Sequence, residues 1–476
     1  MRIIDYGVRP SSANDVVQIS GTEWTPNVDG GGNILDSEWH QLPLFTTLKV
    51  MTNTLDDVIP TPRYGTKGGS ADGSVGIVRA WGGAAIDPVN ERMYVSGGGH
   101  ADSHMCDNGG YKLDSATLRF SVAWDRSALP GWAWRNPNQA TPSSSDDGTP
   151  RQWVDFTGPT DPWNESRGNP QADGLPSSAH TYWMLTWHEG TEGHPGYVIY
   201  HYTAKAVIDL STGLPDVTHW NRSATGVSSD NVNYSDAVAL QSGWKIFQPY
   251  GDFYMRAWDY AQREATDWST EFGGGTDSLG KILYPAATST SGGFTHGGRL
   301  IRNTRTYMRL HGRGEVVCLG VQSEVEAQAF HRRLRLDEAV AATVSYGAGT
   351  NWASYFDTLT LTSSDDSHLD FGVQANFASN SYPSPPAHFY AAAAVWDDDT
   401  DTAWVWGNRT DSDLYKLTGL ASGNTVTTER QASTARPLTT SYNGTFERAM
   451  LVKRGAATCL VRVSSTTAEP EIVRVA

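Results

Sequence analysis

Short runs of alternating apolar and polar residues recur along the chain, separated by turns rich in glycine, proline, asparagine and aspartate. The clearest group predicts four strands, at 80–86, 92–96, 109–114 and 119–124. A four-stranded unit of this size cannot bury both of its faces by itself. It therefore predicts neighbouring units of the same kind.

Five further groups of strands follow, and they open near residues 178, 235, 294, 387 and 446. In three units the third strand ends in an aspartate, namely Asp114, Asp209 and Asp259. Repeats of about 45 residues with four short strands each predict sheets arranged radially about an axis. We therefore predict an all-β fold, a β-propeller of about six four-stranded blades. A large β-sandwich is the alternative, and long inserts at 126–177 and 332–386 leave room for a seventh blade.

Weaker patterns give three further assignments. The fourth strand of the third unit is expected at 265–268, and the fourth unit is expected to open with a strand at 294–301. A helix is expected at 323–340, where Ser323 and Glu326 have the spacing of a capping box.

The sixth group contains three strands, so its sheet needs a fourth from elsewhere. An unpaired edge strand is an aggregation liability, and we expect a strand from the N-terminal region to close the ring. The segment 36–42 contains a tryptophan, like the ends of other fourth strands, and is predicted to be that strand. Residues 1–32 are predicted to form a docking arm and residues 33–476 to form the propeller with its inserts.

Composition excludes several classes of function. The chain of 476 residues carries a net charge of −16 and has no long basic run, so nucleic-acid binding is not expected. Three cysteines are too few for a disulfide framework or a zinc ribbon. The first residues lack the apolar core of a signal peptide, and no apolar run is long enough to span a membrane. Synthesis in a cytoplasm without Sec-type export is therefore expected.

The glycine triplet at 97–99, followed by His100-Ala-Asp102 and then by the strand that ends at Asp114, resembles the kelch or galactose-oxidase type of propeller repeat. The resemblance covers residues 80–476. The triplet followed by His-x-Asp is also similar to propellers in virion proteins of tailed bacteriophages. Kelch propellers are mostly binding scaffolds, whereas galactose oxidase implies a copper site with a Cys–Tyr crosslink. No cysteine here lies in such a setting, so oxidase activity is not expected.

Histidines recur at corresponding places in the predicted blades. In a propeller, the connection into each first strand and the connection between the second and third strands emerge on the same face. One mouth of the ring is therefore expected to carry six side chains: His100, Asp102, His104, His180, His296 and His388. The first three have i, i+2, i+4 spacing, which would suit a divalent zinc, manganese or iron ion. The favoured interpretation is that they hold a glycine-rich turn in shape, and no cofactor is expected.

The insert 126–177 contains four tryptophans among proline, glycine, serine and aspartate: Trp132, Trp134, Trp153 and Trp163. Flat aromatic faces beside polar groups suit sugar rings, although they also anchor protein interfaces or pin a loop to its own fold. The acidic run Asp397–Asp401 is interpreted as a solvated turn, because it lacks the glycine and the distal glutamate of an EF-hand loop.

These features favour a non-enzymatic virion protein of a tailed bacteriophage, in the tail fibre, baseplate or head decoration. Its expected partners are other virion proteins or a host surface glycan, within a homo-oligomer or a larger assembly. A polysaccharide-degrading hydrolase or lyase is the alternative, since a carboxylate pair needs to be close only in space. A cellular kelch-type adaptor ranks last.

Overall fold

The computed structural model describes twenty stretches of the chain. They are residues 18–60, 76–79, 82–97, 108–126, 185–190, 193–200, 206–215, 238–239, 245–250, 254–259, 281–283, 306–310, 312–322, 329–335, 337–338, 355–363, 392–406, 414–431, 448–465 and 467–476. Within them the fold is all-β, with five sheets and two short helices.

The first sheet is antiparallel and follows chain order, as the sequence predicts. It consists of β4 (Ala84–Asp87), β5 (Arg92–Ser96), β6 (Gly110–Asp114) and β7 (Arg119–Trp124). Local turn chemistry ends its strands. The Asp87 carboxylate accepts hydrogen bonds from the backbone N–H of Val89 and of Asn90, at 3.0 and 2.9 Å, and this side-chain mimic of a turn favours a hairpin.

Two more four-stranded antiparallel sheets follow in chain order. The second is β8 (Leu185–His188), β9 (Tyr197–Tyr200), β10 (Ala206–Asp209) and β11 (Leu214–Pro215). The third is β12 (Val238–Ala239), β13 (Lys245–Tyr250), β14 (Tyr254–Asp259) and β15 (Lys281–Leu283). Each third strand ends at the predicted aspartate. The fourth strand of the third unit was predicted wrongly, because β15 at 281–283, and not 265–268, pairs with β14. Residues 265–268 lie outside the described residues.

Eight strands form one larger sheet from two four-stranded halves. The first half is β16 (Thr306–Leu310), β17 (Glu315–Gln322), β18 (Ala329–Arg335) and β19 (Phe356–Ser363). The second is β20 (Ala393–Asp397), β21 (Thr402–Trp406), β22 (Leu414–Thr418) and β23 (Thr425–Gln431). The outer strands β19 and β23 pair in parallel, while the first strands β16 and β20 lie side by side. This sheet is therefore nearly closed, like a barrel.

The helix predicted at 323–340 is wrong, because residues 329–335 form β18. This strand pairs with β17 and with β19, and pairing on both sides overrides local helix propensity. Its buried positions include His331 and Arg333, so it lacks the apolar alternation that identifies a strand. The predicted insert 332–386 therefore begins within β18 and contains β19. The fourth sheet also opens with β16 at 306–310, and the strand predicted at 294–301 lies outside the described residues.

The sixth group forms β24 (Ala449–Arg454), β25 (Ala457–Arg462) and β26 (Glu471–Arg474), and its sheet is completed from the N-terminal region. The completing strand is β3 (Thr47–Val50), which pairs antiparallel with β26. Completion of the last sheet by an N-terminal strand is thus confirmed, but the segment predicted for it is wrong. Beyond β3 the sheet continues with β2 (Glu23–Thr25) and β1 (Gln18–Ser20), which lie within the segment 1–32.

The segment predicted as the closing strand is instead α1 (Asp36–Gln41). A helical turn places Trp39 and Leu42 on one side, and both are buried in the core that the first and last sheets share. The Trp39 ring meets the Trp24 ring edge-on, with 5.7 Å between the ring centroids. A second short helix, α2 (Gly76–Arg79), precedes β4 and packs beside β5.

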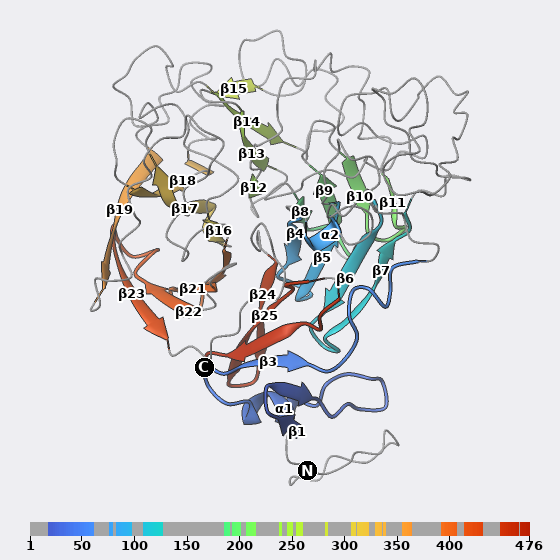
Figure 1. Cartoon of the computed structure of the whole chain (residues 1–476). Helices are drawn as coiled ribbons and strands as arrows, with labels where there is room; N and C mark the ends of the chain where they lie inside the picture. Colours follow the sequence, from blue (N-terminus) through green and yellow to red (C-terminus); the bar gives the residue numbers. More distant parts are fainter. Residues whose placement is uncertain are drawn as a thin grey trace, which may run out of the picture.

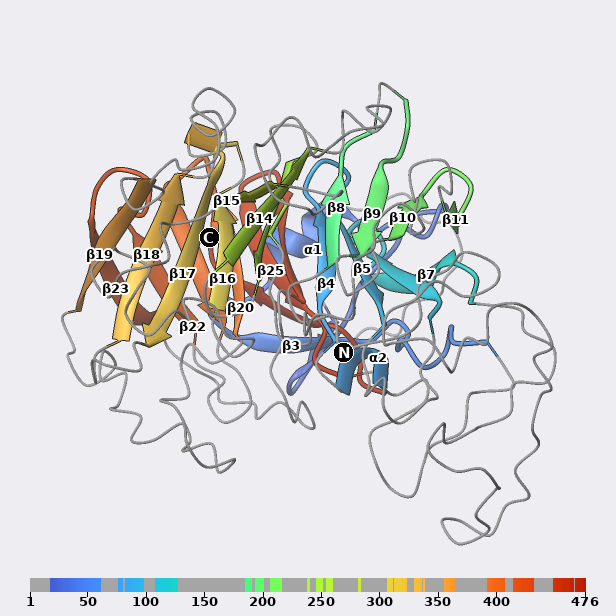
Figure 2. The ribbon, with the colours of Figure 1, turned by 90° about the horizontal axis from the view of Figure 1, so that it is seen from above.

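Each of the strands β4, β8, β12, β16, β20 and β24, which open the groups of strands described above, lies beside another strand of this set. The neighbouring pairs are β24 with β4, β4 with β8, β8 with β12, β16 with β20, and β20 with β24. In Figure 1 these first strands lie toward the middle, and the outer strands β3, β7, β11, β15, β19 and β23 lie toward the periphery. Figure 2, seen from above, shows the strands of neighbouring sheets running across the thickness of the molecule.

The N-terminal region also holds the outer edge of the first sheet. The Asn53 side chain donates to the carbonyl of Phe120 at 3.0 Å and accepts from the N–H of Phe120 at 2.8 Å. Thr52 donates to the carbonyl of Leu118 at 2.6 Å. Since Phe120 lies in β7, one side chain takes the place of a further strand at this edge. Residues 47–53 therefore strap the last sheet to the first from outside.

Candidate functional site at the loop face

The antiparallel sheets give the molecule two distinct faces. We call the face at which β4, β20 and β24 begin the loop face, and the face at which these strands end the turn face. The pairs Ala84↔Val95, Ala393↔Trp406 and Ala449↔Arg462 show that the second strands end at the loop face. The connections from second to third strands, and from one sheet to the next, therefore leave from the loop face.

All ten predicted site residues lie outside the described residues: His100, Asp102, His104, His180, His296, His388, Trp132, Trp134, Trp153 and Trp163. The stretches of chain that contain them are bounded by described strands. These stretches follow β5, β7, β15 and β19 and precede β6, β8, β16 and β20. Each of them leaves the described fold at the loop face and returns to it there. That the side chains gather at one mouth stays a prediction.

The two ends of the stretch 98–107 are held firmly at the loop face. Ser96 Oγ donates to the carbonyl of Gly109 at 2.8 Å, and the indole N–H of Trp124 donates to the carbonyl of Asn108 at 3.2 Å. At Gly110 a Cβ atom would lie 2.1 Å from the Trp124 ring, so only glycine fits there. The stretch that carries the His-x-Asp motif thus starts and ends on fixed backbone.

Two fully buried arginines, which no sequence pattern indicated, lie beside these connections. Arg448 immediately precedes β24, and Arg462 ends β25; neither side chain is exposed. Arg462 Nε lies 2.6 Å from a carboxylate oxygen of Glu471, and its guanidinium lies 4.0 Å from the centroid of the Trp406 ring. The cation–π contact joins the last sheet to β21 of the eight-stranded sheet, and the buried ion pair holds β25 to β26 within the last sheet.

Arg448 joins the last sheet, which contains β24, to the first. Its Nε donates to the carbonyl of Val463 at 3.0 Å, and its Nη1 donates to the carbonyl of Gly82, which precedes β4. Burial lowers the pKa of Arg448 to about 9, and repulsion from Arg462 acts in the same direction. Burial also lowers the pKa of Arg462, and Glu471 opposes that effect. These cations fix the loop-face ends of three sheets beneath the predicted mouth.

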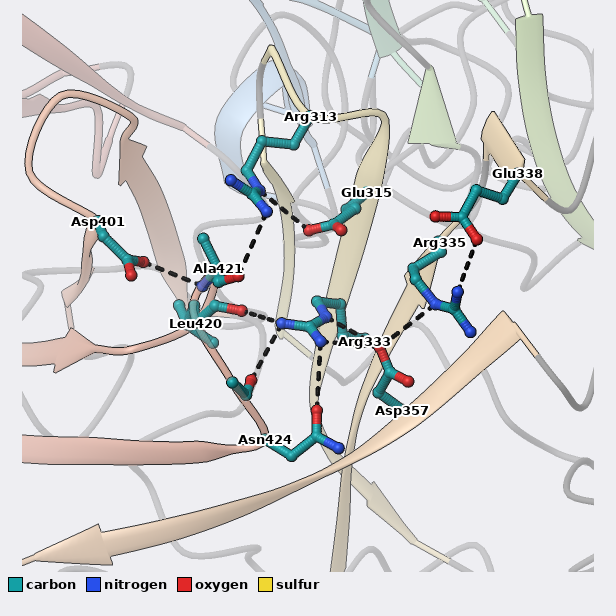
Figure 3. Close-up of polar contacts among 11 residues, drawn as sticks. Arg313, Glu315, Arg333, Arg335, Glu338, Asp357, Asp401, Leu420, Ala421 and Asn424 are labelled. Atoms are coloured by element: carbon teal, nitrogen blue, oxygen red, sulfur yellow. Dashed lines mark hydrogen bonds and ion pairs between the residues drawn. The ribbon is translucent and has the colours of Figure 1, made fainter.

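Charged side chains on the turn face connect the two halves of the eight-stranded sheet (Figure 3). Arg333 of β18 lies 2.8 Å from a carboxylate oxygen of Asp357 in β19. Its guanidinium also donates to the carbonyls of Leu420 and Gly423 in the turn between β22 and β23, at 3.0 Å for Gly423. Arg313 donates to the carbonyl of Ala421 at 3.3 Å. These bonds satisfy the backbone of a neighbouring turn, which is a structural role.

A second set of ion pairs on the turn face comes from the hairpin between β24 and β25. Lys453 Nζ lies 2.5 Å from Asp397 and 2.6 Å from Asp399, at the turn between β20 and β21 of the eight-stranded sheet. The neighbouring Arg454 pairs with Glu91 and donates to Ser115 Oγ at 2.8 Å, in the first sheet. One hairpin thereby holds two other sheets.

The acidic run Asp397–Asp401 forms the turn that the sequence predicts. Asp397 accepts from the N–H of Asp399 at 3.2 Å and from the Thr400 hydroxyl at 2.9 Å. Its side chain is buried against Lys453, so this residue is not solvated as expected, whereas Asp399 is exposed. In the described part of the chain, no three His, Cys, Asp or Glu side chains group as metal ligands. No helix in that part is long and apolar enough to cross a membrane.

Comparison with known proteins gives little. No family model matches the chain, and no curated protein matches it. Among solved structures, a chain in the crystal structure of the mitotic checkpoint complex is similar at 9% identity and a TM-score of 0.34, covering 88% of this chain and 95% of that one. A likeness at this TM-score defines neither the fold nor the function.

Proposed function

We propose that the chain is a six-bladed β-propeller whose last blade is closed by β3. The proposed blades are β4–β7, β8–β11, β12–β15, β16–β19, β20–β23, and β24–β26 with β3. The adjacent first strands support this count, because a radial arrangement puts the first strand of every blade next to the axis. The larger eight-stranded sheet is then two blades that pair at their outer edges.

We further propose that this propeller is a non-enzymatic binding module of a tailed-bacteriophage virion, assembled with other copies or other virion proteins. One observation carries the proposal of a binding face. Every stretch that contains a candidate histidine or tryptophan begins and ends at the loop face. Long connections on a rigid scaffold are where binding residues concentrate. The aromatic and polar composition of these stretches suits a host surface glycan or a protein partner.

Binding of host capsular polysaccharide or lipopolysaccharide to the purified full chain tests the proposal. We expect binding to fall by at least tenfold in the double variant Trp132→Ala, Trp134→Ala. The control is His40→Ala, an exposed residue of α1 whose ring lies beside Gly455 on the turn face. It should bind like the wild type. Equal binding by all three proteins, or no binding to any surface glycan, would refute a glycan-binding loop face.

The same incubation distinguishes binding from hydrolysis or elimination. Release of reducing ends or unsaturated uronates that disappears in a His100→Ala, His104→Ala variant would replace the binding-only proposal with an enzymatic one. Mass spectrometry of purified particles tests the virion assignment separately. Absence of the chain from particles would overturn that assignment and leave the binding measurement intact.

A further inference from the structure

The two halves of the eight-stranded sheet meet through a strand that changes its partner (Figure 1). Residues 356–359 of β19 pair antiparallel with β18, whereas residues 360–363 pair in parallel with residues 425–428 of β23. We call this second pairing the join. The last pair before the change is Leu359 with His331, so His331 lies where the first half of the sheet ends and the join begins.

The pairing of His331 with its other neighbour, β17, is irregular. The register between β17 and β18 shifts between Cys318 and Val321, so two residues of β17 lie opposite His331. An extra residue in a ladder interrupts the hydrogen bonds and bends the strand. β18 is therefore held less firmly by β17 at the residue that borders the join.

The His331 side chain lies in the core that the two halves share. It is 6% exposed, and its partner Leu359 belongs to an apolar core with side chains from both halves. Residues paired in register point to the same side of a sheet, so the imidazole faces this core. Leu361, within the join, packs against the same core and pairs with Val426. Imidazole and join thus share one apolar environment.

This environment favours a neutral imidazole. Among the described side chains on this side of the sheet, the charged residues Arg333 of β18 and Asp357 of β19 pair with each other at 2.8 Å (Figure 3). β17 contributes the apolar Leu319 to the core, and β22 contributes Tyr415. Burial lowers the pKa of His331 from 6.5 to about 3, so the imidazole is neutral in the folded chain at pH 7.

We infer that His331 makes the join acid-sensitive: a proton on this imidazole favours separation of residues 360–363 from β23. An imidazolium in an apolar core is unfavourable, whereas an open join brings the ring to water, where it takes up the proton readily. Because the pKa of His331 is lower when the join is closed, the stability of the join is complete above pH 6.5 and is lost as the pH falls from 6.5 toward 3. The bulge and the change of partner localise this loss to the join.

Hydrogen exchange of the full chain at pH 7 and pH 5, followed by mass spectrometry, tests this inference. Protection of peptides that cover residues 360–363 and 425–428 is expressed relative to the intrinsic exchange rate at each pH. If opening restores the ordinary pKa of 6.5, protection at the join should fall about 25-fold between pH 7 and pH 5. Peptides from β5 and β6 of the first sheet should keep their protection.

Replacement of the histidine separates its effect from that of other titratable groups. His331→Gln keeps a polar side chain of similar size but gains no proton in this range, so protection at the join should be equal at the two pH values. His188→Gln is the matched control, because His188 is also buried but lies in β8 of the second sheet. Its join should lose protection as the wild type does.

Three results would overturn the inference. Unchanged protection of the wild-type join between pH 7 and pH 5 would do so whether or not any variant folds. An equal loss in His331→Gln would show that another group is responsible. An equal loss in the peptides from the first sheet would show that acid acts on the whole fold and not on the join.

Discussion

Replacing Asn53 by alanine removes the side chain that takes the place of a strand at the edge of β7. Two hydrogen bonds disappear together, because Asn53 both donates to and accepts from the backbone of Phe120. The N–H and carbonyl of Phe120 then lack these partners at the outer edge of the first sheet. The strap between the last and first sheets is weakened, while the pairing of β3 with β26 is retained.

The size of the effect follows from the two bonds. At about 1 kcal/mol of net free energy for each hydrogen bond, Asn53→Ala should lower the free energy of unfolding by about 2 kcal/mol. Unfolding entropy is about 2.1 cal/mol/K per residue. For 476 residues this corresponds to about 1 kcal/mol/K, so the melting temperature should fall by about 2 °C. A larger fall would mean that the strap opens as a separate unit.

Differential scanning calorimetry measures the fall in melting temperature, and hydrogen exchange at Phe120 measures the loss of its hydrogen bonds to Asn53. Asn90→Ala is the matched control, because the Asn90 side chain makes one bond, to Asp87 at 2.8 Å, within a hairpin turn. It should cost about half as much, with no change in exchange at Phe120. If Asn53→Ala leaves both the melting temperature and the exchange of Phe120 unchanged, the proposed strand-mimicking role is wrong. Newly exposed backbone at β7 should also promote aggregation on heating.

Three further predictions concern packing, charge and thiol reactivity. Gly110→Ala should lower the free energy of unfolding in denaturant melts by about 1–3 kcal/mol, because its methyl would overlap a tryptophan ring. The control Gly423→Ala has space for the methyl and should be near neutral. Equal losses of stability in the two variants would contradict this account. Lys453→Met should be less stable than wild type at pH 7. Lys453 holds the pKa of Asp399 below 3.8, so the ionised Asp399 stabilises the folded chain above pH 3.8. The stability difference between the variant and the wild type should therefore narrow as the pH falls below 3.8 and through the lowered pKa. A constant difference would count against the ion pair. Burial raises the pKa of Cys459 to about 12, so iodoacetamide at pH 8 should alkylate the peptide containing it only after unfolding, and ready alkylation of the folded chain would contradict its burial.

The regular sheets were predictable because their signals are local. Asp87, Asp114 and Asp209 each end a strand and accept backbone N–H bonds within the next three residues. Residue types at fixed spacings therefore predict where the hairpins lie. Alternation between such turns was enough to locate the strands of the first sheet, with small changes at their ends.

Features that depend on distant partners were not predictable in this way. Residues 329–335 form a strand because β17 and β19 flank them, although two buried positions are charged or polar. The need for a closing strand could be inferred, but not which N-terminal segment would meet β26. Arg448 and Arg462 flank apolar strands in the sequence, as solvent-exposed residues often do. Their burial arises only when three sheets meet.

Closure by β3 has a consequence for how the protein is made. This strand leaves the ribosome before its partner β26, which follows only after residues 51–470 have been synthesised. At ordinary translation speeds that interval is on the order of tens of seconds. Throughout it the nascent chain holds an early strand whose eventual neighbour does not yet exist. The last sheet therefore cannot be completed before β26 has been synthesised, and the waiting strand is the segment for which a chaperone would matter most.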